Sequence, residues 1–433
     1  MITRLVSFLR AQLGQAWWLW TCLFLVGAVT NFGTAIIRLR TLLPSPQPID
    51  FAAYYVGSWA MRLGASPYYW PAEMLRSVAA GQHMMITPAP PVSPPPWVWL
   101  TQGLTVFSFP VAAWIWLAVQ MAMIVWCTSA LVRIAGHPGW RATLVACPFT
   151  ITFGSTFLNL TTGQNGLFVL LGVVLLARHL SRPRTRSLAA VVGWVIAVAA
   201  KIYPLLWIAA WPFLKKRLAL AMAVTVVAVF VVILLVEPAA NKDYWLRFLP
   251  ESAESYGGGV RVDDQSLGAR VALIGRTSEL GFSGKDVETR HENVWRPPRE
   301  MPIGLVNLIT GAALLILAAG VVLVWMRSDR VRYGEGLFYL VVLYALLPIP
   351  HMERYNHVAI LPAMAWLWGQ DRKYRSLTVA AYCLVGLSRL NHLWALIFGW
   401  PLGPLATGTC LYAVLVLGLG IAHRVLSRSN STC

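Results

Sequence analysis

Apolar segments of about 20 residues recur along the chain and are separated by short polar clusters. Clear examples are residues 17–37, 218–236 and 303–325. Segments of this length suit helices that cross a bilayer, and a helix satisfies its own backbone groups in lipid. The period-two alternation of a β-barrel is absent. The pattern therefore predicts an all-α polytopic membrane protein, with about 11–13 transmembrane helices.

Basic clusters between the apolar segments predict the orientation of the chain. They lie at residues 182–186, 215–217, 327–332 and 371–375. Lys and Arg gather in cytoplasmic loops, so these loops and both termini are expected in the cytoplasm of a plasma or inner membrane. The chain then forms one transmembrane domain over residues 1–433, with two large outer loops at 38–91 and 237–300.

One stretch of the expected topology is broken. Residues 187–200 and 202–214 are predicted as two short helices that meet at Lys201.

A second stretch has one apolar run too many. Between the first outer loop and the basic cluster that begins at residue 182, the topology needs an odd number of membrane crossings. The sequence offers four apolar runs there: 93–108, 111–132, 142–160 and 165–180. One of these runs must be re-entrant or interfacial, and the two that proline interrupts are the candidates.

Composition narrows the classes of function. Only 12% of the residues are charged and 58% are hydrophobic, with a mean hydropathy of +0.62. The net charge of +18 is carried by loop clusters, which argues against nucleic-acid binding. On the expected topology, 14 of the 17 acidic residues fall at or beyond the outer face. A proton-coupled transporter would bury acids within its helices, so carboxylate chemistry on the outer side is favoured.

Asp50 opens the first outer loop and is the first candidate for chemistry. Phe51, Tyr54, Tyr55 and Trp59 follow at helical spacing, which predicts an interfacial helix with one aromatic face. The helix dipole would favour the ionised form of Asp50 near its N-terminus. An N-cap aspartate followed by an ordinary aromatic belt explains the same pattern.

Two polar elements lie deep in apolar sequence. The cluster "TTGQNG" at residues 161–166 reads as a helix start, but Gln164 and Asn165 are costly there without hydrogen-bond partners. Lys201 stands alone in a long apolar stretch, which makes it a functional candidate as a partner for phosphate. Its side chain could also simply extend to the outer interface.

Two outer segments supply further candidates. "DDQSLGARVALIGR" contains Arg270 and Arg276, which could contact an anion or could merely be solvated. "PHMERYNHV" brings His351, Arg354 and His357 into one outer turn. The spacing of its histidines is not HExxH, and the six cysteines show no CxxC pair, so a metal site is not expected.

Taken together, these motifs resemble glycosyltransferase family 87, a family of the GT-C superfamily. The motifs occur in the family's order: "D…YY…G…PY" from Asp50, a Pro-rich helix start, "GQNG", "K.YP" at Lys201, "QSL" with a following Arg, and "H…LP". The resemblance spans about residues 50–362. Asp264 stands where the family commonly has Asn before "QSL", and "SPPP" from Ser93 replaces the aromatic "YPP".

The resemblance implies an inverting transferase that takes a sugar from a polyprenyl-phosphate donor. Mannose is the sugar the family is best known for, and other members transfer arabinofuranose, so the resemblance does not determine the sugar. The acceptor would be a hydroxyl group of a lipid-linked or cell-envelope glycan at the outer membrane face. Asp50 would act as the general base. Lys201, Gln164, Asn165, Arg270, Arg276, His351, His357 and Arg354 would contact the donor or its phosphate, and Tyr54, Tyr55 and Tyr68 would line the substrate. No metal or other cofactor is implied.

Two other classes fit parts of the pattern. A lipid or glycan transporter would predict inverted repeats and acids within helices, and the sequence has neither. An outer-face glycan polymerase or ligase fits the topology nearly as well, because several arginines lie in the loop at 237–300. The donor distinguishes these enzymes. The glycosyltransferase would use one sugar on a polyprenyl monophosphate, whereas the polymerase or ligase would use a glycan on a diphosphate.

Overall fold

The computed structural model describes residues 17–38, 46–84, 90–181, 187–213, 216–251, 264–276, 297–328, 330–349 and 352–429, and within them it contains helices and no strand. The helices before the middle of the chain are α2 (Trp17–Arg38), α3 (Ile49–Arg62), α4 (Ala72–Gly81), α5 (Pro95–Thr101), η2 (Gln102–Val106), α6 (Phe109–Ile134), α7 (Trp140–Thr152), α8 (Gly154–Thr162), α9 (Gly166–Ser181), α10 (Ser187–Ala200) and η3 (Tyr203–Phe213). The later helices are α11 (Lys216–Val236), α12 (Pro238–Asp243), η4 (Tyr244–Phe248), α14 (Leu267–Gly275), α15 (Ile303–Arg327), α16 (Arg330–Tyr344), η5 (Arg354–Ile360), α17 (Leu361–Trp368), α18 (Arg372–Leu387), η6 (Ser388–Leu390), α19 (Asn391–Ala406) and α20 (Thr409–Ser429). The expected all-α membrane fold is confirmed.

Within the described residues, four helices are long and apolar enough to cross a membrane: α6, α11, α15 and α20. The bent pair α7 and α8, which meet at 68°, makes a fifth if the pair is one span. Shorter apolar helices lie at 25–37, 166–180, 188–200 and 333–344. By length and composition the structure therefore supports four or five spans, and the higher count of 11–13 would depend on short or broken helices.

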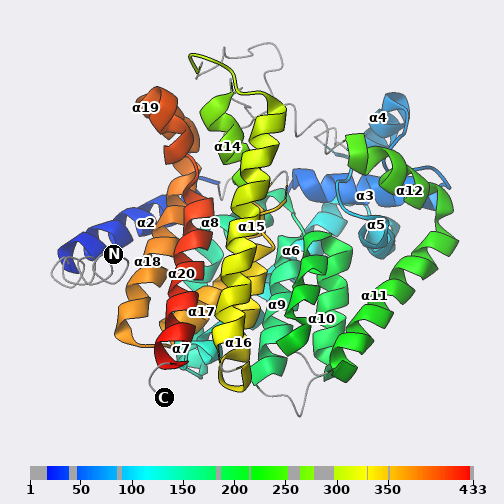
Figure 1. The fold of residues 1–433 in the computed structure, drawn as a ribbon. Coiled ribbons are helices and arrows are strands. Elements are labelled where there is room, and N and C mark those ends of the chain that lie inside the picture. The colour runs from blue at the N-terminus through cyan, green and yellow to red at the C-terminus, as the bar shows by residue number, and fades with distance from the viewer. Residues whose placement is uncertain are drawn as a thin grey trace.

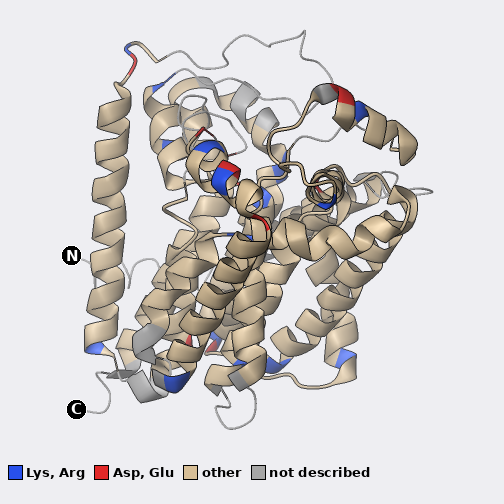
Figure 2. Ribbon diagram, turned by 90° about the vertical axis from the view of Figure 1, so that its right-hand side faces the viewer, with Lys and Arg blue, Asp and Glu red and all other residues tan. Residues whose placement is uncertain are grey.

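The two ends of the helix bundle differ in structure and in charge. Helices α3, α4, α5, α12, α14 and α19 gather at one end, called here the α3 end (Figure 1). At the opposite end α9 and α15 finish, and α10, α11 and α18 begin (Figure 1). This second end, called the basic end, carries Arg217, Arg327, Arg372 and Lys373. Most described acidic residues lie toward the α3 end (Figure 2).

The apolar run at residues 93–108 does not form a membrane-spanning helix. It folds as the seven-residue helix α5 and the five-residue turn η2, which together are too short to cross a bilayer. Both pack against α3 at the same end of the bundle. The other proline candidate, Pro148, lies inside α7, just before the bend to α8. The sequence named both segments as candidates, and both are irregular in the structure: the first is too short to span, and the second is a bent pair that is either a broken span or a re-entrant loop.

Helices α9 and α10 pack closely against each other, and small residues allow their approach. A Cβ atom built on Gly172 would lie 2.6 Å from the carbonyl oxygen of Gly193 and 2.7 Å from Cβ of Ala197. Transmembrane helices associate closely where small residues let their backbones meet. Because α10 ends at Ala200, this contact also determines where the chain presents Lys201.

We expect Gly172→Ala to destabilise the protein by about 1–3 kcal/mol, because a backbone carbonyl in the way cannot move as a flexible side chain could. Gly320→Ala is the matched control, since a Cβ at that position of α15 meets nothing within 4 Å. In the control, alanine should be neutral or stabilise the helix by up to about 1 kcal/mol. Thermal unfolding in detergent measures both variants, and equal stabilities would show that the α9–α10 contact is not tight.

Candidate active site

Asp50 lies in the first turn of α3 and remains partly exposed. The N-cap residue is Pro48, and no side chain caps the helix, so the carboxylate of Asp50 is not used as a cap. Burial raises the pKa of Asp50 to about 6, and the negative charge of Glu353 adds to this shift. The effect of burial outweighs the helix dipole that was expected to keep this carboxylate readily ionised.

Gln164 lies near both the Asp50 carboxylate and the Lys201 ammonium group. Its Oε1 atom accepts hydrogen bonds from the Tyr54 hydroxyl at 2.9 Å and from Nζ of Lys201 at 3.3 Å. The neighbouring side chains of Thr162 and Gln164 lower the pKa of Asp50 and so favour its ionised form. Lys201 acts on Asp50 in the same direction through its positive charge. One amide thus lies between a carboxylate and an ammonium group at the α3 end.

The turn that carries Gln164 is held by polar side chains of α6. Nε1 of Trp116 donates to the carbonyl oxygen of Gly163 at 2.9 Å, and Nε2 of Gln120 donates to the carbonyl oxygen of Gln164 at 2.6 Å. Gly163 ends α8 in the left-handed conformation, with φ of 72°. A Cβ there would lie 2.6 Å from Cβ of Phe51. Glycine therefore allows both the turn and the close packing of α3 on it.

Asn165 positions Lys201 rather than facing an open site. Its side chain is fully buried, and its Nδ2 donates to Oγ of Ser93 at 2.9 Å and to the carbonyl oxygen of Ala200 at 2.7 Å. The second bond holds the end of α10, directly before Lys201. The ammonium group of Lys201 lies 5.0 Å from the centre of the Tyr355 ring, a favourable cation–π distance. The lysine is thus held from two sides.

The structure also ties η5 to this turn. Nδ2 of Asn159 donates to the carbonyl oxygen of Tyr355 at 2.9 Å. Gly166 packs at the same point, because its Cβ would lie 3.1 Å from that carbonyl oxygen. Residues of α3, α8, α10 and η5, which are far apart in the sequence, therefore meet around Asp50.

The three tyrosines expected to line the substrate are buried inside the protein. Tyr54, Tyr55 and Tyr68 are each at most 2% exposed. The hydroxyl of Tyr55 donates to Gln82 and to the carbonyl oxygen of Phe107, and that of Tyr68 donates to the carbonyl oxygen of Ser93. The aromatic face of α3 packs inward, with Phe51 stacked on Trp116 at 4.9 Å. Tyr55 and Phe51 help to hold α3 in place, and Tyr54 reaches the site through its hydrogen bond to Gln164.

Arg270 lies at the α3 end but is used in packing. It is 5% exposed and donates to the Thr407 hydroxyl and to the carbonyl oxygens of Pro404 and Asp264. Oδ1 of Asp264 accepts from the backbone N–H groups of Ser266 at 2.8 Å and Met352 at 3.0 Å. The side-chain carbonyl of an asparagine could accept the same two hydrogen bonds. Asp264, which stands where the family commonly has Asn, therefore keeps this pair of backbone contacts.

The remaining predicted cations are placed differently from Lys201. Burial lowers the pKa of His357 to about 4, so this imidazole is neutral at physiological pH. Arg354 donates to the carbonyl oxygen of Ser388 at 3.1 Å, and Arg276 is the partly exposed C-cap residue of α14. His351 lies outside the described residues. Among the predicted cations that the structure describes, Lys201 is the one it brings to Asp50.

Glu353, Thr162 and Gln120 contribute to the site but were not among the predicted site residues. In the sequence, Glu353 was considered only as an alternative base, with His351 and His357, should Asp50 not be the base. Thr162 was read as part of a helix start. Gln120 carried a usable signal, because it is a lone amide within the 26-residue apolar helix α6. Its position there is costly unless its hydrogen bonds are satisfied, and it is satisfied by this turn.

Comparison with known proteins identifies one family. Residues 92–350, which are more than half of the chain, match glycosyltransferase family 87. The matched range includes Gln164, Asn165, Lys201 and Arg270, and it begins after Asp50. No curated protein matches the chain. Among the described residues, no group of three or more His, Cys, Asp and Glu side chains could hold a metal ion.

Proposed function

Because the chain belongs to glycosyltransferase family 87, we propose that it moves a sugar from a polyprenyl-phosphate donor to a hydroxyl group of a lipid-linked or cell-envelope glycan. Mannose is the sugar that the family resemblance favours. The observation that carries the proposal is that Asp50, Gln164 and Lys201 lie together at the α3 end, where Lys201 donates to Gln164 and both act on the pKa of the Asp50 carboxylate.

The chemistry of such a donor matches a site with one carboxylate base. A polyprenyl phosphate leaves as a phosphate anion and needs no protonation, so the enzyme needs a general base for the acceptor hydroxyl and a cation near the phosphate. Paired acid and base carboxylates of the glycosidase type are unnecessary. A pKa of about 6 brings Asp50 closer to the operating pH than an ordinary aspartate, which strengthens it as a base while leaving it mostly ionised.

Lys201 is the group we assign to the donor phosphate. Its side chain is partly exposed, as are those of Asp50 and Glu353, whereas Gln164 and Asn165 behind them are buried. The exposed groups can therefore reach a substrate, and the buried amides position them. One ammonium group faces two carboxylates here, so a bound phosphate would compete with them for Lys201.

Inversion requires the acceptor hydroxyl and the departing phosphate to lie on opposite faces of the anomeric carbon. Asp50 would accept the hydroxyl proton on one face as the new glycosidic bond forms. Lys201 would balance the charge of the phosphate as the old bond breaks. The family resemblance implies that a β-linked donor then gives an α-linked product. The acceptor and the linkage position are not part of the proposal.

We expect Asp50→Asn to reduce the transfer rate at least a hundredfold, since general base catalysis contributes about 10²–10⁴-fold. Donor binding should change little, because the base acts on the acceptor hydroxyl. Glu73→Gln is the matched control: Glu73 is an exposed acid on α4 at the same end of the bundle, and its loss should leave the rate unchanged. Measurement of kcat together with donor Kd tests this. A normal rate in Asp50→Asn, or a loss explained by donor binding alone, would remove Asp50 from its role.

The pH dependence of transfer gives an independent test of the same cluster. The base must be ionised, so the rate should fall as the pH drops through about 6, the pKa of Asp50. Glu353→Gln removes a charge that raises this pKa, so the acidic limb should move to lower pH. Lys201→Met removes a charge that lowers it, so the limb should move to higher pH.

The profile of kcat against pH for the three proteins, each normalised to its own maximum, measures these shifts. Lys201→Met should also raise the KM of the donor, because a lost charge contact costs about 1.5–3 kcal/mol. Shifts in the same direction for both variants would contradict the assignment of Asp50 as the titrating base.

We propose that the α3 end faces the outside of the cell, as the distribution of basic loops suggests. In a variant without its native cysteines, a cysteine at Glu73 should react with a membrane-impermeant thiol reagent in intact cells. A cysteine at Lys373, an exposed position of the basic end, should react only after permeabilisation. The reverse pattern would place the site in the cytoplasm.

A further inference from the structure

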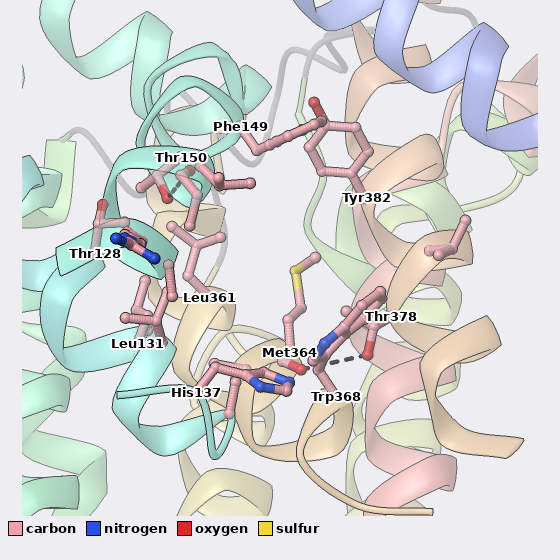
Figure 3. Close-up of a pocket in the computed structure, with 18 residues that line it drawn as sticks. Thr128, Leu131, His137, Phe149, Thr150, Leu361, Met364, Trp368, Thr378 and Tyr382 are labelled. Carbon is pink, nitrogen blue, oxygen red and sulfur yellow. Dashed lines mark hydrogen bonds between the residues drawn. The ribbon is translucent and has the colours of Figure 1, made fainter. Parts of the chain in front are cut away.

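A cavity of about 590 Å³ lies toward the basic end, between α6 and α7 on one side and α17 and α18 on the other. Figure 3 shows Phe149 and Tyr382 at one end of the cavity and His137 and Trp368 at the other. Its volume is in the range of sites that enclose a small organic molecule, about 300–1,000 Å³. It does not include any residue of the Asp50 site.

The interior of this cavity is suited to hydrocarbon. Leu131, Val145, Leu361 and Met364 line it, together with other apolar side chains. The threonine hydroxyls in its wall are used within the protein. Thr128 donates to the carbonyl oxygen of Ile124, Thr150 to that of Ala146, and Thr378 to that of Met364. A sugar would find few polar partners here, whereas an acyl chain would need none.

The rim toward the basic end is cationic on both sides. His137 and Arg141 line the cavity from the connection between α6 and α7 and from the first turn of α7. Arg375 of α18 lies beside Trp368, which lines the cavity from α17: its guanidinium is 5.6 Å from the centre of the Trp368 ring and its Nε donates to the Trp368 carbonyl oxygen. Both arginines are exposed, so their charges are available to a ligand at the membrane surface.

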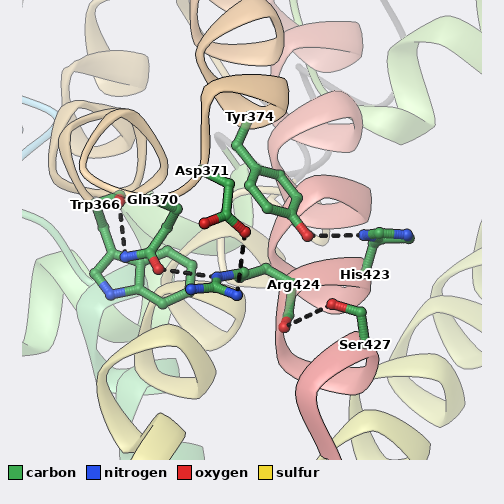
Figure 4. Close-up of polar contacts among 7 residues, drawn as sticks. All are labelled: Trp366, Gln370, Asp371, Tyr374, His423, Arg424 and Ser427. Atoms are coloured by element: carbon green, nitrogen blue, oxygen red, sulfur yellow. Dashed lines mark hydrogen bonds and ion pairs between the residues drawn. The ribbon is translucent and has the colours of Figure 1, made fainter. Parts of the chain in front are cut away.

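The acid nearest to this rim in the sequence is paired elsewhere. Asp371 directs its carboxylate to Nη1 of Arg424 on α20 at 3.4 Å, and Arg424 also binds Gln370 (Figure 4). The neighbouring Tyr374 is likewise joined to His423 of α20. These contacts turn the polar groups at the start of α18 toward α20.

In a bilayer, an apolar cavity by itself does not select a ligand, because every lipid tail is equally apolar. Selection must come from the head group, and basic pockets between helices attract anionic lipid head groups. We propose that this cavity binds one anionic glycerophospholipid of the adjacent leaflet, with an acyl chain between α7 and α17 and its phosphate between Arg141 and Arg375.

The position of this lipid gives it a structural role for the candidate site. Helix α7 continues through the bend into α8, which ends at Thr162, and η5 with Tyr355 leads directly into α17. A lipid between α7 and α17 would hold the spacing of the two segments that carry these residues. The phosphate of the sugar donor is assigned to the opposite end of the bundle, so the two lipids are distinct ligands.

The test compares phosphatidylglycerol with phosphatidylcholine on the purified full-length protein. Native mass spectrometry in detergent should show one retained phosphatidylglycerol with a clear preference over phosphatidylcholine. Arg141→Gln and Arg375→Gln should each weaken retention about fivefold, as expected for one arginine at the membrane surface. Arg217→Gln removes an exposed charge from the start of α11, away from the cavity, and should leave retention unchanged.

A second arm locates the acyl chain and does not depend on charge variants. Phosphatidylglycerol with a photoreactive acyl chain should label peptides of α7 and α17, and Ala146→Phe, which fills the cavity from α7, should abolish that labelling. Equal retention of both phospholipids, an equal loss in Arg217→Gln, or labelling confined to other helices would overturn the proposal. Displacement of phosphatidylglycerol by an equal amount of polyprenyl phosphate would also overturn it and assign the cavity to the donor chain.

Discussion

The Gln164 side chain is the contact on which the candidate site depends. A carboxylate and an ammonium group cannot both be placed in an apolar protein unless polar groups form hydrogen bonds with them. Gln164 accepts from Lys201 and Tyr54, and its side chain lies within reach of Asp50. The backbone around it is held by Trp116 and Gln120. Two charges with different roles can thus remain close without either being left buried and unpaired.

This arrangement explains why so many buried polar residues of the chain lie in one region. The side-chain amides of Asn165, Asn159 and Gln120 each donate to backbone carbonyl groups of other segments. Each such bond satisfies a carbonyl group at a helix end or in a turn, where helices leave these groups unpaired. The same bonds join α6, α8, α10 and η5, so the polar network that positions the charges also assembles the fold at this end.

Sequence reasoning was most successful where a polar residue stood alone in apolar surroundings. Gln164 and Lys201 were identified because each is costly without a partner, and the break in structure at Lys201 lies between α10 and η3 as expected. Residue type alone did not indicate burial. The tyrosines expected at the substrate and Arg270, expected at the phosphate, are buried and hydrogen-bonded within the protein, and their roles stay predictions. The proximity of Glu353 to Asp50 could not be predicted, because about 300 residues separate them and no local pattern reports tertiary contact.

The central claim is that this chain transfers a single sugar from a polyprenyl monophosphate with inversion. The most direct measurement incubates the purified protein with labelled β-linked polyprenyl-phosphomannose and a membrane-lipid extract, and determines the anomeric configuration of the labelled product. The account predicts an α-mannosylated lipid or glycan and the release of polyprenyl monophosphate. A β-linked product, or transfer only from a glycan on polyprenyl diphosphate, would contradict it.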